Sequence, residues 1–541
     1  MKPHNRLGNR IKHIIDRGDP LLSIALDTVR IGKQALIFLN TKQRAEKTAE
    51  EISKHLIVEE QNKKKLDALS EEVLSALESP TEQCKRLASC IKTGIAFHHS
   101  GLVQKQRELI EENFRNGTIK IICCTPTLAY GLDLPAFRVV VRDLKRFGAR
   151  GMELIPVLEV QQMFGRAGRP SYDSEGEALC IAENETQEEM IREKYFTAEP
   201  EPIYSKLAVE PVLRTYLLSL ISSGIVSNLQ EIISFFNKTF WAHQFRDTKT
   251  FQKIIKNTLE ELEEWEFISS GEKEKKGEEF LSAYEIKNMN AHTERNVFST
   301  RIGQRVSQLY IDPLTAHQMI QCLKRAERKE HDTFAYLQMI SNTLEMKPLL
   351  NVKNKELEEI YDFLLEHEQL LLVVPPKEYE VEYDDFIRSV KTAMLFNDWI
   401  EEKSEDYLME KYGIRPGEFS VKRGNADWLL YSCEELCKIL SLRECESELR
   451  RLRIRMEYGA KEELVPLLRL KGIGRIKARI LYNNRIRDLG DVKKTPMAAL
   501  TSILGKTLAI SIKAQVGESP KEEAENSGTL LNGSWHPLSE E

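Results

Sequence analysis

The strongest constraint on the fold is an alternation of short apolar runs and helical segments through the first 195 residues. The apolar runs stand at 32–40, 94–101, 119–125, 137–143 and 177–182, and segments with helical apolar spacing occupy 42–56 and 102–117. Strands joined by helices of this length form βαβ units, so the sequence predicts a parallel sheet. Ligand sites gather at the carboxyl ends of such strands, so we expect chemistry after Asn40, Thr125 and Asp143.

Length and composition allow several globular domains. The chain has 541 residues, of which 41% are hydrophobic and 30% charged, and about 150 residues per domain predicts three to four domains. No apolar run is long enough to span a membrane, and the first 20 residues lack the apolar core of a secretion signal. Nine dispersed cysteines favour a reducing, cytoplasmic compartment. Cys433, Cys437 and Cys445 share a helical stretch, where packing is favoured over metal binding, and we predict no metal site.

The spacing of apolar residues predicts that the rest of the chain is mainly helical. Three helical segments at 209–226, 229–236 and 251–268, followed by EFLSAYEIKN, resemble a winged helix, with KEKKGE at 273–278 as the wing turn. A plain helical packing block is the alternative. We predict a parallel-sheet α/β domain at 1–195, a winged helix at 196–300, a helical domain at 301–458, a basic helical unit at 459–516 and a disordered acidic tail at 517–541.

Charge is distributed unevenly along the chain. The net charge is −6, but 450–516 holds 16 Lys+Arg against 5 Asp+Glu, so 16 − 5 gives +11. The tail from 517 has one Lys and six Glu, or −5, which leaves −6 − 11 + 5 = −12 for residues 1–449. A basic module on an acidic chain indicates a nucleic-acid partner, although a solvated charged surface explains the charge about as well.

Two strings carry residues suited to phosphate chemistry. In QMFGRAGRP at 162–170, two arginines three positions apart can present planar, permanently charged guanidiniums to one phosphate. In CCTPTLAYGLDLPA at 123–136, a strand ends in a loop of threonines and a glycine, whose hydroxyl and N–H groups suit a phosphate backbone. Asp133 is placed to link the nucleotide and nucleic-acid sites. The alternative for the first string is two surface arginines on a glycine-rich turn.

The order of ALIFLNTKQRAE, AFHHSGL, CCTPTLAYGLDLPA and QMFGRAGRP resembles the second RecA-like lobe of superfamily 2 helicases. Within that superfamily it is similar to the Ski-type branch and its archaeal Hjm/HELQ-like DNA repair helicases. The resemblance implies that 1–195 is a second RecA-like helicase lobe, 301–458 a helical ratchet domain and 459–516 a helix-hairpin-helix. The resemblance implies ATP and Mg²⁺ as cofactors, with Arg166 and Arg169 facing the γ-phosphate and Gln162 orienting the nucleotide. It also implies nucleotide-side roles for Gly131, Asp133 and Gly165, and tracking-strand phosphate contacts for Thr125 and Thr127.

Three further elements follow from the residues and the resemblance together. Gly148 and Gly151 bound a tight turn within 144–159, which predicts a hairpin; in the family this insertion separates strands, with Phe147 near its tip. Trp428, in 424–440, is the expected base-stacking residue of the ratchet helix, although a buried core tryptophan is nearly as well supported. Relatives pair this tryptophan with an arginine two turns earlier, where this chain has Val421.

The basic run contains the string LLRLKGIGRIKARIL at 467–481, which fits a helix-hairpin-helix. Its two glycines allow backbone N–H groups to approach a phosphate at a helix N-terminus. Arg479 adds positive charge, and sequence-independent DNA contacts are expected from Lys471, Gly472, Gly474, Arg475 and Lys477.

The sequence contains neither a GxxxxGK[ST] phosphate loop nor a DExH motif. We therefore expect the C-terminal part of an ATP-dependent 3′→5′ DNA helicase that acts on single-stranded and forked DNA in repair and recombination. This chain is expected to need a separate first RecA-like lobe, to bind no cofactor alone and to hydrolyse no ATP alone. Replication or repair proteins are possible partners, and no membrane is expected. The alternatives are a non-catalytic DNA-binding protein and a Ski-type RNA helicase component.

Overall fold

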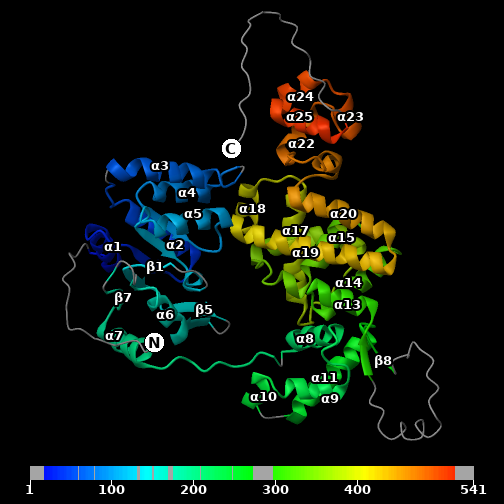
Figure 1. Cartoon of the computed structure of the whole chain (residues 1–541), viewed down its shortest axis with the longest axis horizontal. Coiled ribbons are helices and arrows are strands. Elements are labelled where there is room, and N and C mark those ends of the chain that lie inside the picture. Colours follow the sequence, from blue (N-terminus) through cyan, green and yellow to red (C-terminus); the bar gives the residue numbers. More distant parts are fainter. Residues whose placement is uncertain are drawn as a thin grey trace, which may run out of the picture. The chain divides into compact units, whose positions relative to one another are not determined.

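A computed structural model describes residues 18–517, except 272–295 and short gaps at 59, 78, 131–133, 149–150, 169–172, 174, 208 and 246–247. Its contacts divide the described chain into two compact units. The first comprises 18–399 and 403–449, and the second comprises 400–402 and 450–517. Figure 1 shows the elements of both units with the labels used below.

The first unit opens with the predicted parallel sheet. Its strands are β1 (Ala35–Phe38), β2 (Ile95–His98), β3 (Ile121–Cys124), β4 (Arg138–Val141) and β7 (Glu177–Cys180), in the order β2-β3-β1-β4-β7. All four adjacent pairs are parallel. Every residue of β1 to β4 is buried, as expected of a parallel sheet covered on both faces. The predicted α/β fold class is confirmed.

Helices surround this sheet (Figure 1). They are α1 (Pro20–Arg30), α2 (Lys42–Ser53), α3 (Glu60–Leu74), α4 (Glu82–Ile91), α5 (Gln104–Arg115), α6 (Val157–Phe164) and α7 (Glu185–Ile191). Side-chain caps fix several starts: Asp19 accepts from two backbone N–H groups of α1, and Thr41 and Thr81 cap α2 and α4. The sequence analysis did not predict the α3–α4 pair.

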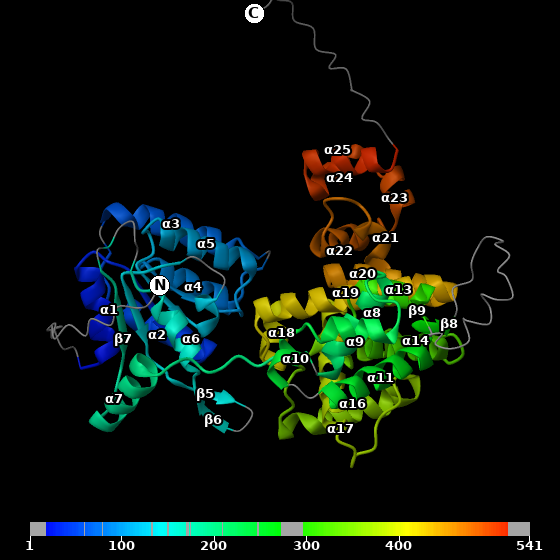
Figure 2. The same cartoon turned by 60° about the horizontal axis from the view of Figure 1, so that its bottom comes forward.

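The predicted hairpin is present between β4 and α6. Strands β5 (Lys145–Gly148) and β6 (Gly151–Leu154) pair antiparallel, with Gly148 opposite Gly151. Gly151 has φ +105°, a conformation that side chains rarely adopt. Figure 2 shows the two strands as a ribbon separate from the five-stranded sheet.

A helix-turn-helix region follows. It contains α8 (Glu210–Ser222), α9 (Leu229–Phe236), α10 (Phe240–Phe245), α11 (Thr248–Glu264) and the antiparallel pair β8 (Ile268–Gly271) and β9 (Asn296–Ser299). Phe236, Trp241 and Phe251 form its aromatic core, in which the Trp241 and Phe251 ring centroids lie 4.0 Å apart. The predicted wing turn at 273–278 and the segment 279–288 lie outside the described residues.

Helices make up the remainder of the first unit, as predicted. They are α13 (Arg301–Leu309), α14 (Pro313–Ala326), α15 (Thr333–Ser341), α16 (Leu357–His367), α17 (Tyr383–Ile400), α18 (Glu405–Tyr412), α19 (Pro416–Leu440) and the start of α20 (Arg443–Tyr458), whose residues from 450 belong to the second unit. The Pro375–Pro376 pair falls in the break between α16 and α17. The predicted ratchet helix corresponds to α19, which starts earlier than 424 because Pro416 occupies its first turn.

The second unit has a separate core. Its helices are α21 (Val465–Leu468), α22 (Arg475–Asn483), α23 (Leu489–Lys494), α24 (Met497–Leu504) and α25 (Lys506–Gln515). Buried Leu467, Ile473, Leu481, Leu500 and Ile512 hold them together. Figure 2 shows α24 and α25 side by side. In neither unit does a described helix combine the length and apolarity needed to cross a membrane.

Candidate nucleotide and nucleic-acid sites

The two phosphate-type strings lie side by side in the structure. The N–H of Ala136 donates to the carbonyl oxygen of Arg166 (2.9 Å), and the N–H of Gly168 donates back to Ala136 (2.7 Å). Gly168 has φ +91°, and a Cβ placed on Gly176 would lie 2.3 Å from the Gly168 nitrogen. A side chain at Gly176 would therefore clash with the Gly168 backbone, and Gly168 has a backbone conformation that side chains rarely adopt. These two backbone hydrogen bonds join the loop after β3 to the loop after α6.

Arg166 connects the same two loops through its side chain. Its guanidinium is partly exposed and donates to the carbonyl oxygen of Ala129 (2.6 Å), in the 3-10 turn Pro126–Ala129. Gln162 lies in the last turn of α6; its Oε1 is buried and has no hydrogen-bond partner among the described residues. Gly165 is the exposed C-cap of α6. Gly131, Asp133 and Arg169 lie outside the described residues.

Thr125 and Thr127 follow the carboxyl end of β3, as the sequence predicted. Thr125 is buried and Thr127 is exposed. Their hydroxyl oxygens lie 2.9 Å apart, within hydrogen-bonding distance. The N–H of Thr125 donates to the carbonyl oxygen of His98 at the end of β2 (3.2 Å). The loops after β2 and β3 are thus held together at one edge of the sheet.

The hairpin is anchored at this same edge. The Asn40 side chain, just after β1, donates to the Lys145 carbonyl oxygen (2.9 Å), and its backbone N–H donates to Asp143 (3.1 Å). Arg146 pairs with Glu159 on α6 (2.7 Å). Phe147 lies in β5 opposite Met152. The three loops that the sequence singled out, after Asn40, Thr125 and Asp143, therefore meet at one edge.

A buried ionic cluster joins this edge to α19. Glu46 on α2 is 2% exposed and accepts from Arg415 Nε (3.0 Å) and Arg86 Nη1 (2.9 Å). His99 Nε2 lies 3.1 Å from Glu46, and His99 Nδ1 accepts from the Gly101 N–H (3.1 Å). The Nδ1 lone pair is therefore engaged, so the ring proton lies on Nε2, facing the carboxylate.

Two pKa values in this cluster are shifted. Burial opposes ionisation of Glu46, but hydrogen bonding from His99 and the charge of Arg415 outweigh it and lower the pKa of Glu46 to about 2. Burial lowers the pKa of His99, which is thus neutral near pH 7. The sequence analysis identified neither Glu46 nor Arg415. The only local signal was that Glu46 lies on the apolar face of an amphipathic helix.

The backbone of α19 also contacts the loop after β2. The N–H of Gly417 donates to the Gly101 carbonyl oxygen (2.9 Å). A Cβ on Gly417 would lie 2.3 Å from the Leu102 carbonyl oxygen, so only glycine allows this approach. Lys42 and Glu418 form an ion pair beside it. The first turn of α19 is therefore fixed to the RecA-like region.

Trp428 lies in the middle of α19 and is partly exposed. Its Nε1–H donates to the carbonyl oxygen of Leu309 at the end of α13 (3.0 Å). Val421, two turns earlier, is 60% exposed. An exposed valine supplies no hydrogen bond or charge, so this chain lacks at 421 the contact that an arginine would make.

The helix-hairpin-helix is present in the second unit. Gly472 has φ +91° in the turn between α21 and α22, and Gly474 is the N-cap of α22. The side chain of Gln515 receives the N–H of Lys471 (2.8 Å) and donates to its carbonyl oxygen (3.2 Å), which fixes the hairpin. Lys471 and Lys477 are exposed. Arg475 is partly exposed and donates to the Gly459 carbonyl oxygen (3.3 Å).

Arg479 differs from its neighbours. Its guanidinium pairs with Glu402 (2.6 Å) and Glu463 (2.7 Å). These carboxylates, partly opposed by burial, raise its pKa above the ordinary value. The sequence analysis counted Arg479 among the charges that attract DNA, whereas the structure uses it to hold the second unit together.

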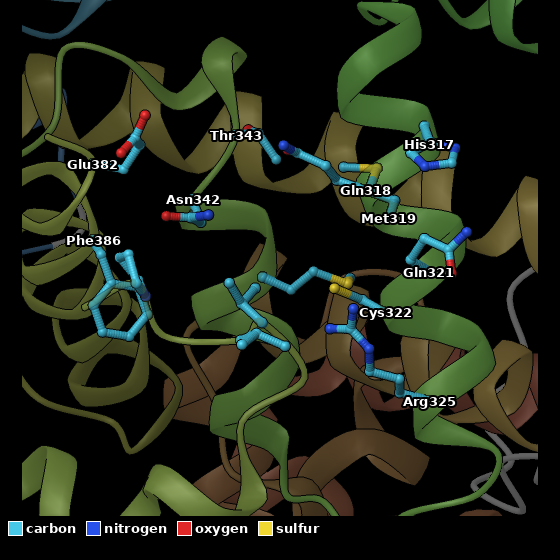
Figure 3. A pocket seen from close by; sticks show the side chains of 14 residues that line it. His317, Gln318, Met319, Gln321, Cys322, Arg325, Asn342, Thr343, Glu382 and Phe386 are labelled. Atoms are coloured by element: carbon cyan, nitrogen blue, oxygen red, sulfur yellow. The ribbon is translucent and has the colours of Figure 1, made fainter. Parts of the chain in front are cut away.

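A cavity of about 370 Å³ opens between α14, the end of α15 and the segment before α17. Figure 3 shows its lining, with His317, Gln321 and Arg325 on one side and Asn342, Glu382 and Phe386 on the other. None of the predicted site residues lines it.

The fold and loops are those of a second RecA-like helicase lobe with appended helical domains, and comparisons with known proteins agree. The profile of the helicase conserved C-terminal domain matches residues 18–171, a helix-turn-helix domain matches 176–269, and domain 4 of archaeal helicases matches 334–459. The chain is 38% identical over 501 residues to the ATP-dependent DNA helicase Hel308 of Methanococcus vannielii, and 36% identical over 516 residues to that of Pyrococcus abyssi.

These alignments cover 88% and 94% of this chain and 65% and 67% of the two relatives. Hel308 of Pyrococcus horikoshii is 38% identical over 486 residues, which is 63% of its length. The chain belongs to the Hel308 family of archaeal superfamily 2 DNA helicases, and it spans about two thirds of the length of these curated relatives.

Proposed function

We propose that this chain provides the second RecA-like lobe and the DNA-engaging domains of an ATP-dependent 3′→5′ DNA helicase that processes forked or branched DNA in repair and recombination. The observation that supports the proposal is the pair of backbone hydrogen bonds that joins the loop after β3 to the loop after α6. It presents the partly exposed Arg166 side chain beside Ala129, in the loop that follows β3.

Two of the described residues are suited to binding a nucleoside triphosphate. Gln162 has a buried oxygen without a hydrogen-bond partner among the described residues, so this side chain is not committed to a structural hydrogen bond through that atom. Arg166 presents a permanent positive charge near it. Bound ATP with Mg²⁺ supplies the phosphoryl group whose transfer drives helicase motion. In this proposal Gln162 orients the nucleotide, Arg166 and Arg169 stabilise charge on the γ-phosphate, and Gly131, Asp133 and Gly165 shape the surrounding loops.

The DNA contacts proposed for this chain fall on four elements. Thr125 and Thr127 hold phosphates of the tracking strand, and Phe147 on the hairpin stacks on the last base pair. Trp428 on α19 stacks on a base of the same strand. Lys471, Gly472, Gly474, Arg475 and Lys477 hold the phosphate backbone without reading sequence.

Hydrolysis additionally requires a phosphate-cradling lysine and Mg²⁺-binding carboxylates on a first RecA-like lobe. We propose that such a lobe works with these residues, in one polypeptide or in two. The test is ATP hydrolysis and fork unwinding by the 541-residue chain, alone and with the first lobe of a Hel308 relative. DNA binding with background hydrolysis alone, and DNA-stimulated hydrolysis after addition of the lobe, support the proposal. Robust hydrolysis by the chain alone, or no DNA binding, contradicts it.

A further inference from the structure

Tyr310 is unusual in both its backbone and its exposure. It is the C-cap of α13, with φ 58° and ψ 24°, in the left-handed region. A non-glycine residue there is uncommon, and an exposed aromatic ring gains nothing from burial to offset the strain. Its side chain is 81% exposed, although Leu309 before it is 5% exposed and Ile311 after it is 1% exposed.

The turn that carries Tyr310 is rigid. Asp312, two residues later, is buried, caps α14 and forms a bidentate pair with Arg214 (2.7 and 2.9 Å). The N–H of Asp312 donates to Glu345 (2.8 Å). Both neighbours of Tyr310 are buried, and Asp312 is held by its ion pair with Arg214. The fold therefore directs the Tyr310 ring outward.

Tyr310 lies beside Trp428. The indole N–H of Trp428 donates to the carbonyl oxygen of Leu309 (3.0 Å), which belongs to the peptide group linking Leu309 to Tyr310. Arg305, one turn earlier on α13, reaches Tyr431 and Glu435 on α19 (3.3 and 2.5 Å). The two helices therefore run antiparallel, and Tyr310 is placed toward the part of α19 that precedes Trp428.

That part of α19 presents an open surface. Val421, Gly424 and Trp428 share one face, since they are three and four residues apart. Val421 is 60% exposed, and a Cβ added to Gly424 would have no heavy atom within 4 Å. Leu344, near the Asn425 contact with Glu345, is 43% exposed. An uncovered strip thus runs along α19 with an aromatic ring beside it.

We propose that Tyr310 is a second base-stacking residue, which works with Trp428 on single-stranded DNA and supplies the contact that Val421 does not. This inference rests on the proposed function. A rigid exposed aromatic suits the task, because every base has a π-face and a fixed ring loses little entropy on stacking. Single-stranded DNA fits better than a folded protein partner, because the strip is a single narrow helix face and not a broad apolar patch.

The test compares the affinities of the 541-residue wild-type chain and its variants for a fluorescent oligo-dT at one fixed salt concentration. Removal of one stacked base–aromatic contact typically costs enough to weaken binding about tenfold. We expect this loss for Tyr310→Ala, and also for Tyr310→Gly, which removes the ring without backbone strain. Tyr310→Phe keeps the ring and should remain within about twofold of wild type. Tyr379→Ala, at a tyrosine that is 79% exposed, is the matched control and should have no effect.

An oligonucleotide with abasic sites separates stacking from phosphate binding. On abasic DNA, wild type and Tyr310→Ala should bind equally, because the ring has no base to contact. Unchanged oligo-dT affinity for Tyr310→Ala, or an equal loss on abasic DNA, overturns the inference and leaves the proposed function standing. Absence of oligo-dT binding by the wild-type chain refutes the proposed function and this inference with it.

Discussion

Replacing Glu46 by Gln tests whether the buried cluster holds α19 to the RecA-like region. The pKa of Glu46 lies at about 2 instead of its ordinary value of 4.5. At 1.36 kcal/mol per unit, this difference of about 2.5 units corresponds to about 3 kcal/mol of stabilisation near pH 7. Glu46→Gln removes the charge and keeps the shape, so we expect the free energy of opening of α2 and the first turn of α19 to fall by about 3 kcal/mol.

The pH dependence gives the sharper test. Because the folded-state pKa is lowered, the stabilisation is complete above about pH 4.5 and is lost as pH falls through 2. The difference between wild type and Glu46→Gln should therefore shrink from about 3 kcal/mol at pH 7 to about 1 kcal/mol at pH 3. Hydrogen exchange measured by mass spectrometry on peptides covering 42–53 and 415–420 reads this local free energy, since a multidomain chain need not unfold in one step.

Glu50 provides a matched control. It also pairs with Arg86 (2.5 Å), but its side chain is 32% exposed against 3% for Glu46. An exposed pair contributes little, so Glu50→Gln should cost less than about 1 kcal/mol. The reasoning is refuted if Glu46→Gln changes nothing at pH 7, if its effect is the same at both pH values, or if Glu50→Gln costs as much.

Three further outcomes follow from the structure. In the chain reconstituted with a first lobe, Arg166→Ala should reduce ATP hydrolysis at least a hundredfold with oligo-dT affinity unchanged, whereas Arg192→Ala, in an exposed pair with Glu188, should leave both unchanged. Gly417→Ala should open the contact between α19 and Leu102, seen as faster exchange at 98–103, whereas Gly424→Ala should leave that segment protected. The double variant Lys471→Ala/Lys477→Ala should lower the slope of log affinity for DNA against log salt concentration by about 2. Arg479→Ala should instead lower the melting temperature of the second unit, because Arg479 pairs with Glu402 and Glu463.

Local patterns predicted the elements that depend on local physics. The apolar runs ending at Asn40, Thr125 and Asp143 gave the sheet strands and their carboxyl edge, and glycines at 148 and 151 gave the hairpin turn. Helix α3 was missed because it is rich in charged residues and buries few positions, among them Leu66, Leu69 and Val73. The resemblance to helicases supplied roles for single residues, which spacing alone does not contain.

The features that escaped sequence reasoning share a physical cause. Arg415 and Glu46 are 369 residues apart in the sequence, and Arg479 and Glu402 are 77 residues apart. The charged residues of either segment alone are equally compatible with a solvated surface, so the sequence does not show that they pair. Tyr310 is the converse case, because its sequence context of Leu309 and Ile311 suggests a buried residue. Only the left-handed turn reverses that expectation, by burying both neighbours and turning the tyrosine outward. Charge and hydrophobicity therefore predict which residues can be buried, whereas long-range contacts and single backbone conformations decide which of them are.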